Sequence, residues 1–166
     1  GLKEIIDGTV VAKHFKKIFA SEFMYNEEGN AMWAKMAVNY TNKTQFVYRI
    51  NKGVLDINND ADLNSSRPDS EKRVFFSNMI YIGDGLTDVP CMKLVKQSGG
   101  HSIAIYHPGQ HTSATQLLHH ERVDWMFEAD YTEGSALDSA MKTLLHNLAT
   151  YNQLKGINEQ QKREFR

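Results

Sequence analysis

The chain has 166 residues, of which 41% are hydrophobic and 23% charged, a balance typical of one folded domain with a buried core. Lys and Arg number 19 against 20 Asp and Glu, and the resulting net charge of −1 argues against a surface built to bind nucleic acid or acidic membranes. Its single cysteine, Cys91, cannot form an internal disulfide, and no apolar run approaches the roughly 18 residues of a membrane span. We therefore expect a cytoplasmic protein with neither a nucleic-acid nor a membrane partner.

The first part of the chain predicts short helices and a hairpin-like pair of strands. Residues 1–20 place apolar side chains at helical spacing, and Gly8 divides the stretch into two short helices. Residues 20–38 hold two extended runs around a turn rich in Asn and Gly, which predicts a small β-hairpin. A helix is expected next, over residues 44–52, because its apolar side chains lie on one side and a glycine follows closely.

Residues 56–72 form the clearest predicted loop. The segment holds four aspartates and several Asn and Ser residues, with few apolar side chains between them. A connection of this length is either a functional lid or a mobile insertion, and we interpret it as a mobile loop.

From residue 79 onward, apolar runs alternate with helical patterns. The predicted strands are 79–82, 101–106 and 125–129, and the predicted helices are 88–97, 113–122 and a long one from 133 onward. This alternation predicts an α/β fold, a three-layer Rossmann-like parallel sheet with helices on both faces. The polar tail, residues 158–166, is expected to fray.

Residues 83–88, with the sequence GDGLTD, connect the first of these strands to the helix that follows it. Ligands of parallel α/β sheets bind beyond the carboxyl ends of the strands, which is where this turn is expected. Asp84 and Asp88 would repel each other on so tight a turn, and Mg²⁺ would relieve that repulsion. The alternative is a purely structural role, with Asp84 and Gly85 forming a turn and Asp88 capping the helix.

The sequence around this turn, MIYIGDGLTDVPCMKLV at residues 79–95, closely resembles the fourth motif of the haloacid dehalogenase superfamily of phosphohydrolases. Within that superfamily it resembles the phosphoserine-phosphatase-like branch. Residues 99–106 and 129–131 are similar to the next strand and to the end of the last core strand. Residues 19–23 and 28–30 resemble the stretch before the third motif. The resemblance implies an incomplete haloacid-dehalogenase-like core, a Mg²⁺ cofactor and a small phosphorylated metabolite as substrate.

The resemblance also assigns roles within the turn. Asp84 would bind Mg²⁺ directly, and Asp88 would bind it through water or orient a catalytic lysine. Gly83 and Gly85 would form the backbone of the cofactor-binding turn. Thr87 stands where many relatives of this branch have Asn, so the substrate of that branch is not carried over.

The third motif of the family is a lysine at the start of a helix, which stabilises the phosphoryl group. Lys43 matches that placement and is the predicted catalytic lysine, alongside Asp88. Lys52, followed by Gly53, is the rival candidate, because some relatives have a Lys-Gly pair near this point.

Two motifs of the family have no counterpart in the chain. The nucleophile is the first Asp of an Asp-x-Asp motif after an apolar strand, and the second Asp is the general acid and base. The Asp60-Ala61-Asp62 run follows no buried strand and comes after the third motif, so we reject it. A Ser or Thr closing a strand is also absent, and residues 1–6 resemble the stretch directly after that Ser or Thr. Residues 1–166 are therefore predicted to be one partial domain that is inactive alone.

A parallel sheet without its central strand exposes unpaired backbone groups. We therefore expect self-association, or pairing with a missing N-terminal segment. The competing interpretation is a non-catalytic binding or interaction module that keeps a vestigial cation site.

Overall fold

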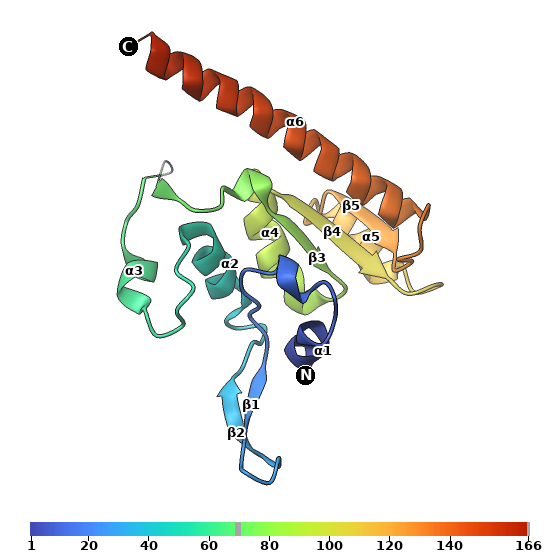
Figure 1. Ribbon diagram of the computed structural model, residues 1–166. Coiled ribbons are helices and arrows are strands. Elements are labelled where there is room, and N and C mark those ends of the chain that lie inside the picture. Colours follow the sequence, from blue (N-terminus) through green and yellow to red (C-terminus); the bar gives the residue numbers. More distant parts are fainter. Residues whose placement is uncertain (69–70, 166) are drawn as a thin grey trace. The chain divides into compact units, whose positions relative to one another are not determined.

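Two sheets organise the chain, and they belong to separate compact units, Gly1–Val74 and Phe75–Arg166 (Figure 1). The computed structural model describes residues 1–68 and 71–165. Residues 69 and 70 of the predicted loop and residue 166 of the predicted tail lie outside the described part. The single partial domain expected over residues 1–166 stays a prediction.

The first unit contains the hairpin that the sequence predicts. Strands β1 (Glu22–Tyr25) and β2 (Ala31–Met36) pair antiparallel, which confirms that prediction. The side chain of Asn26 closes the turn between them, since its Oδ1 accepts hydrogen bonds from two backbone amides within the turn. Of the two helices expected before the hairpin, α1 (Leu2–Asp7) is present, whereas the second is a single 3₁₀ turn, Ala12–His14.

Helix α2 (Lys43–Lys52) follows the hairpin and ends at Gly53, whose left-handed φ of 73° suits glycine. The predicted loop after it is not without regular structure. It contains the short helix α3 (Asp60–Asn64), which the sequence analysis does not predict. The side chain of Asn59 begins this helix by accepting a hydrogen bond from the backbone amide of Asp62.

The second unit is an α/β fold around a parallel sheet in the order β3-β4-β5. Its elements in chain order are the 3₁₀ turn Phe76–Asn78, β3 (Ile80–Gly83), the 3₁₀ turn Leu86–Asp88, α4 (Val89–Gln97), β4 (His101–Tyr106), α5 (Thr112–His119), β5 (Trp125–Glu128) and α6 (Ala136–Glu164). The parallel α/β architecture is confirmed. The last helix continues through residues 158–164, where fraying is expected from the sequence.

Helices cover both faces of this sheet because the side chains of its middle strand alternate between them. On β4, Ala104 lies in a cluster with residues of α4 and α5. Its neighbour Ile103 points to the opposite face and packs with Leu137 and Leu144 of α6.

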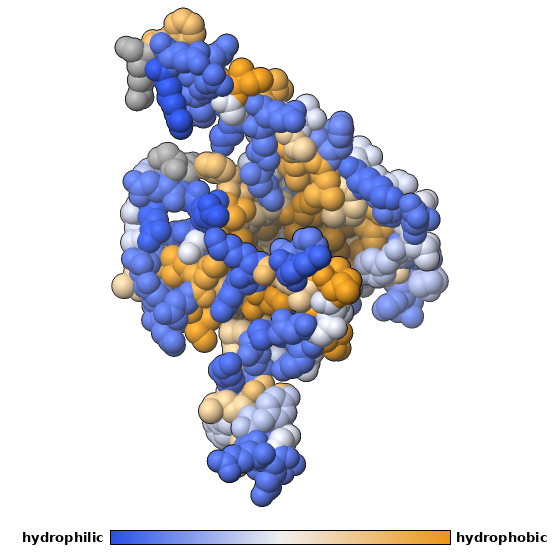
Figure 2. All heavy atoms as spheres, in the orientation of Figure 1, coloured by the Kyte–Doolittle hydropathy of each residue, from blue (hydrophilic) through white to orange (hydrophobic). Residues whose placement is uncertain are grey.

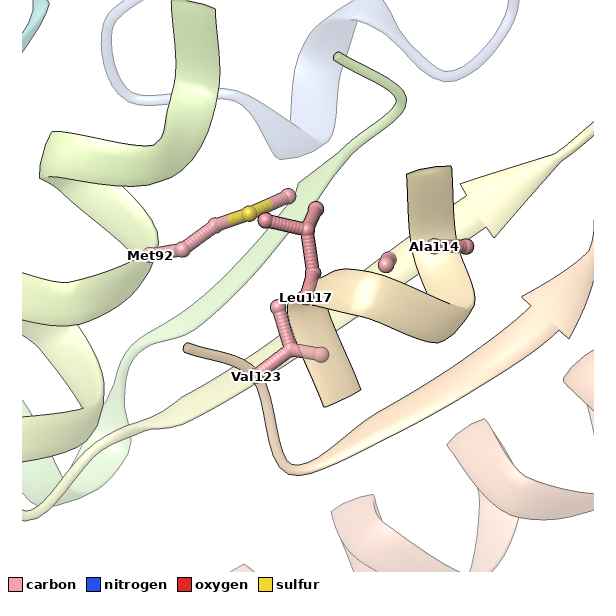
Figure 3. Close-up of a cluster of buried hydrophobic side chains, with 5 residues drawn as sticks. Met92, Ala114, Leu117 and Val123 are labelled. Atoms are coloured by element: carbon pink, nitrogen blue, oxygen red, sulfur yellow. The ribbon is translucent and has the colours of Figure 1, made fainter. Parts of the chain in front are cut away.

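The cluster on the α4–α5 face is the best-buried part of the second unit. Met92 of α4 and Leu117 of α5 point toward each other over the sheet, with Ala114 and Val123 beside them (Figure 3).

Across residues 1–68 and 71–165, no helix combines the length and the apolar character that a membrane crossing requires.

Two adjacent leucines of α5 test this packing. Leu117 is 6% exposed and Leu118 is 37% exposed. The same Leu→Ala change therefore removes many packing contacts at position 117 and few at position 118. We expect Leu117→Ala to lower the free energy of unfolding by about 2–4 kcal/mol and Leu118→Ala by less than about 1 kcal/mol. Urea denaturation measures both, and equal losses would contradict this packing.

Candidate functional site

The candidate site is the turn between β3 and α4, at the carboxyl end of the parallel sheet. Strand β3 ends at Gly83, and a 3₁₀ turn, Leu86–Asp88, leads directly into α4. Pro90 occupies the first turn of that helix, where a missing backbone N–H costs nothing. The strand-turn-helix context predicted for residues 83–88 is therefore present.

Asp88 is buried at the base of this turn, with 6% of its surface exposed. It occupies the N-cap position of α4, yet its side chain makes no capping hydrogen bond. Instead, the hydroxyl of Tyr81 donates to its Oδ1 over 2.7 Å. The carboxyl group also lies against the backbone of Gly83, because a Cβ added there would be 2.8 Å from Asp88 Cγ and Oδ2. The side chain thus turns back toward β3 and does not cap the helix.

The Tyr81 hydroxyl is held as a hydrogen-bond donor. Burial raises the pKa of Tyr81 far above its usual range, and the hydrogen bond to Asp88 raises it further. The buried thiol of Cys91 adds a smaller effect in the same direction. Sequence reasoning missed Tyr81, since it counted only as one more apolar position of a buried strand. The available signal was its place two residues before Gly83, on the same face of β3.

Asp84 differs from Asp88 in being exposed to solvent. No group of three or more His, Cys, Asp or Glu side chains in the described residues is arranged to hold a metal ion. The turn therefore offers two carboxylates, one exposed and one buried. Mg²⁺ is held by one or two carboxylates, with waters and substrate phosphate completing the set, so this donor set suits that ion.

The two candidate lysines lie at opposite ends of α2, in the other unit. Lys43 is the first residue of the helix and is partly buried. Lys52 is the last, and its Nζ donates to the backbone carbonyls of Leu63 and Ser65. The pairing of Lys43 with Asp84 and Asp88 stays a prediction.

The rejected Asp-x-Asp run has a structural role. Asp60 and Asp62 lie in α3, at the end of no strand. The Asp60 carboxylate accepts from the guanidinium of Arg49, and the Asp62 carboxylate accepts from the side-chain amide of Asn59. The Asp60 carboxylate therefore links the segment to α2, and the Asp62 carboxylate stabilises the start of α3.

An apolar cavity of about 750 Å³ lies between α6 and the sheet of the second unit. Its walls include the ring pair His101 and Trp125, whose centroids are 5.9 Å apart, together with Phe127 and Tyr151. Hydrophobic side chains gather beneath α6 in the space-filling view (Figure 2). The described residues that line it include no Lys or Arg, so it lacks the strong cations typical of a phosphate site.

Comparison with known proteins gives one distant relative and no family. The chain is 29% identical over 154 residues to an uncharacterized protein of Borreliella burgdorferi, a match that covers 82% of this chain and 52% of the relative. The chain thus spans about half the length of that protein. No family model matches the chain, and no solved structure matches it.

The Tyr81–Asp88 hydrogen bond is tested by Tyr81→Phe. At neutral pH the variant should lose about 1–3 kcal/mol of unfolding free energy, because the buried carboxylate loses a donor. In the wild-type chain the free energy of unfolding should also fall as pH rises above about 10, because Tyr81 ionises there in the unfolded state only. The variant lacks that contribution, so the difference between the two stabilities in urea denaturation should shrink as pH rises above about 10.

Tyr106→Phe is the matched control. Tyr106 packs against the same core cluster from the neighbouring strand, and its hydroxyl makes no hydrogen bond to another described residue. This variant should change stability by less than about 0.5 kcal/mol at neutral pH. A loss equal to that of Tyr81→Phe would show that the hydrogen bond to Asp88 is not the cause.

Proposed function

We propose that the chain is part of a Mg²⁺-dependent phosphoric monoester hydrolase of the haloacid dehalogenase superfamily, in its phosphoserine-phosphatase-like branch. Its substrate would be a small phosphorylated metabolite in the cytoplasm. The observation that carries the proposal is the placement of Asp88. Its carboxylate is buried against Gly83 at the carboxyl end of a parallel strand, with the exposed Asp84 on the same turn.

The proposed roles follow from these environments. Asp84 would hold Mg²⁺ directly, since its carboxylate is accessible from solvent. Asp88 would act through water or by orienting Lys43, because the bond from Tyr81 fixes its carboxylate in place. The bound ion would neutralise charge on the phosphoryl group of the substrate.

Lys43 is the better candidate for the catalytic lysine. The ammonium of Lys52 already donates to two backbone carbonyls, which supports a structural role for it. Lys43 begins α2, the placement that the resemblance requires, and would stabilise charge developing on the phosphate.

The nucleophile would come from a segment outside these 166 residues. Asp60 and Asp62 lie in a helix and are engaged by Arg49 and Asn59, so they are unsuited to that role. The Borreliella burgdorferi protein is about twice as long as the part matched here, which leaves room for such a segment. A strand of that segment would pair with β3, whose only partner among the described strands is β4. Without such a strand, the exposed edge of β3 would lead the chain to self-associate.

The second candidate is a non-catalytic binding or interaction module with a vestigial cation site. It is favoured by the hydrogen bond from Tyr81, which gives the buried Asp88 carboxylate a structural partner within β3. The coding sequence upstream of Gly1 separates the two candidates. A strand ending in Asp-x-Asp-x-Thr there supports the phosphatase, and its absence supports the binding module.

Magnesium titration tests the site in the chain itself. Mg²⁺ should bind the wild-type chain in calorimetry, and Asp84→Asn should weaken that binding by about tenfold or more, because it removes the exposed carboxylate ligand. Glu27→Gln is the control, since it removes one exposed negative charge from the hairpin turn and should leave binding unchanged. Equal binding by wild type and Asp84→Asn would exclude the proposed site.

The same preparations should not turn over para-nitrophenyl phosphate, because a metal site alone supplies no nucleophile. Turnover by the wild-type chain that Asp84→Ala abolishes would contradict the assignment of the nucleophile to another segment.

A further inference from the structure

A second cleft, of about 800 Å³, lies wholly within the first unit. It is bounded by residues 14–17, by the end of α2 and by residues 71–74, where the chain leaves the unit. Its volume is in the range of sites that take a small organic ligand, roughly 300–1,000 Å³. The proposed phosphatase site does not use it.

The walls of this cleft are strongly basic. Five of the 19 Lys and Arg residues of the chain line it, with one of the 20 Asp and Glu, so the described walls carry an excess of four positive charges. The cations are Lys16, Lys17, Lys52, Lys72 and Arg73, and the carboxylate is Glu71. The chain as a whole has a net charge of −1, so this excess is a local property of the cleft.

Three of these cations are available to a ligand. Lys16, Lys17 and Arg73 are exposed. Within residues 1–68 and 71–165, neither Lys16 nor Arg73 forms an ion pair, and Lys17 lies 5.6 Å from the ring centre of Phe19. Lys52 contributes its carbon chain to the wall, because its ammonium is bound to backbone carbonyls.

The backbone that carries Arg73 is fixed to α2. The buried side chain of Asn51 donates to the carbonyl of Val74, and the amide of Val74 donates back to the carbonyl of Asn51. The stem of Arg73 then lies so close to Gly53 that an added Cβ would be 2.8 Å from Arg73 Cβ. The start of the Arg73 side chain is therefore positioned by the fold before any ligand binds.

An aromatic ring and an aliphatic side chain lie beside the cations. Phe15 is 50% exposed and Ile50 is 40% exposed, and both line the cleft. Cations suit phosphate oxygens, and an exposed ring offers a stacking surface for a planar group. We propose that this cleft binds a small organic phosphate with a planar body, of the nucleoside-diphosphate type, at a site whose lining includes neither Asp84 nor Asp88.

Calorimetric titration with ADP tests the proposal, with EDTA present so that Mg²⁺ plays no part. ADP should bind the wild-type chain, and the double variant Lys16→Gln/Arg73→Gln should bind it at least about tenfold more weakly. The control Lys13→Gln/Lys93→Gln removes the same charge from exposed lysines outside the cleft and should stay within about twofold of wild type. No binding by the wild-type chain, or equal losses in both double variants, would overturn the proposal.

Phe15→Ala separates the two parts of the ligand. It should weaken ADP binding by about fivefold or more and leave the binding of inorganic pyrophosphate unchanged. If pyrophosphate binds as tightly as ADP and Phe15→Ala has no effect on ADP binding, the claim that the cleft recognises a planar body is overturned. Tighter binding of an RNA oligonucleotide than of ADP would assign the cleft to nucleic acid instead. Asp84→Asn should still bind ADP, so failure of the metal site and failure of this cleft are distinguishable.

Discussion

The contact between the Asp88 carboxyl group and the backbone of Gly83 organises the candidate site. A side chain at position 83 would collide with this carboxyl group, so only glycine allows the contact. Tyr81 lies two residues earlier and faces the same side of β3, where its hydroxyl reaches Asp88. One carboxyl group is thus held by two positions of the strand, and it links β3 directly to the start of α4.

This arrangement explains why the two aspartates of one short turn have different environments. Turning back against β3 buries Asp88 and fixes its position through Tyr81. Asp84 comes directly after the end of the strand and stays in solvent. A buried carboxylate with a fixed hydrogen bond is suited to positioning other groups, whereas an exposed carboxylate can exchange water for a cation. The division of roles proposed for the site rests on this difference.

The first unit depends on a comparable buried charge. Arg49 is 1% exposed, and its guanidinium donates to the carbonyls of Asp56 and Ile57 as well as to the Asp60 carboxylate. Both carbonyls lie outside regular structure, and the guanidinium ties them to α2. A segment with few apolar side chains is therefore held from within by one residue of α2.

The regular elements of the second unit could be predicted because each shows a local pattern. Strand β4 was predicted at the residues that form it, and the ends of α4 and β5 fall within one residue of prediction. Helix α3 has only the local signal of its Asn59 cap, and the contact that holds it to α2 comes from Arg49, which lies more than ten residues before it. By sequence, Arg49 is an ordinary helix cation. Tyr81 was missed for the same reason, since its partner lies across a turn.

Net charge was a weaker guide than the alternation of apolar runs. A net charge of −1 argues against a long polyanion as a binding partner, because such a partner contacts a large part of the protein surface. A small anion responds to charges within a Debye length, about 8–10 Å at physiological salt. Lys16, Lys17 and Arg73 lie around one cleft, whereas most of the 20 acidic residues lie elsewhere. The near neutrality of the chain therefore argues against an extended nucleic-acid surface and says little about a local site for a small phosphate. Only the folded structure brings residues 16 and 73 together around one cleft.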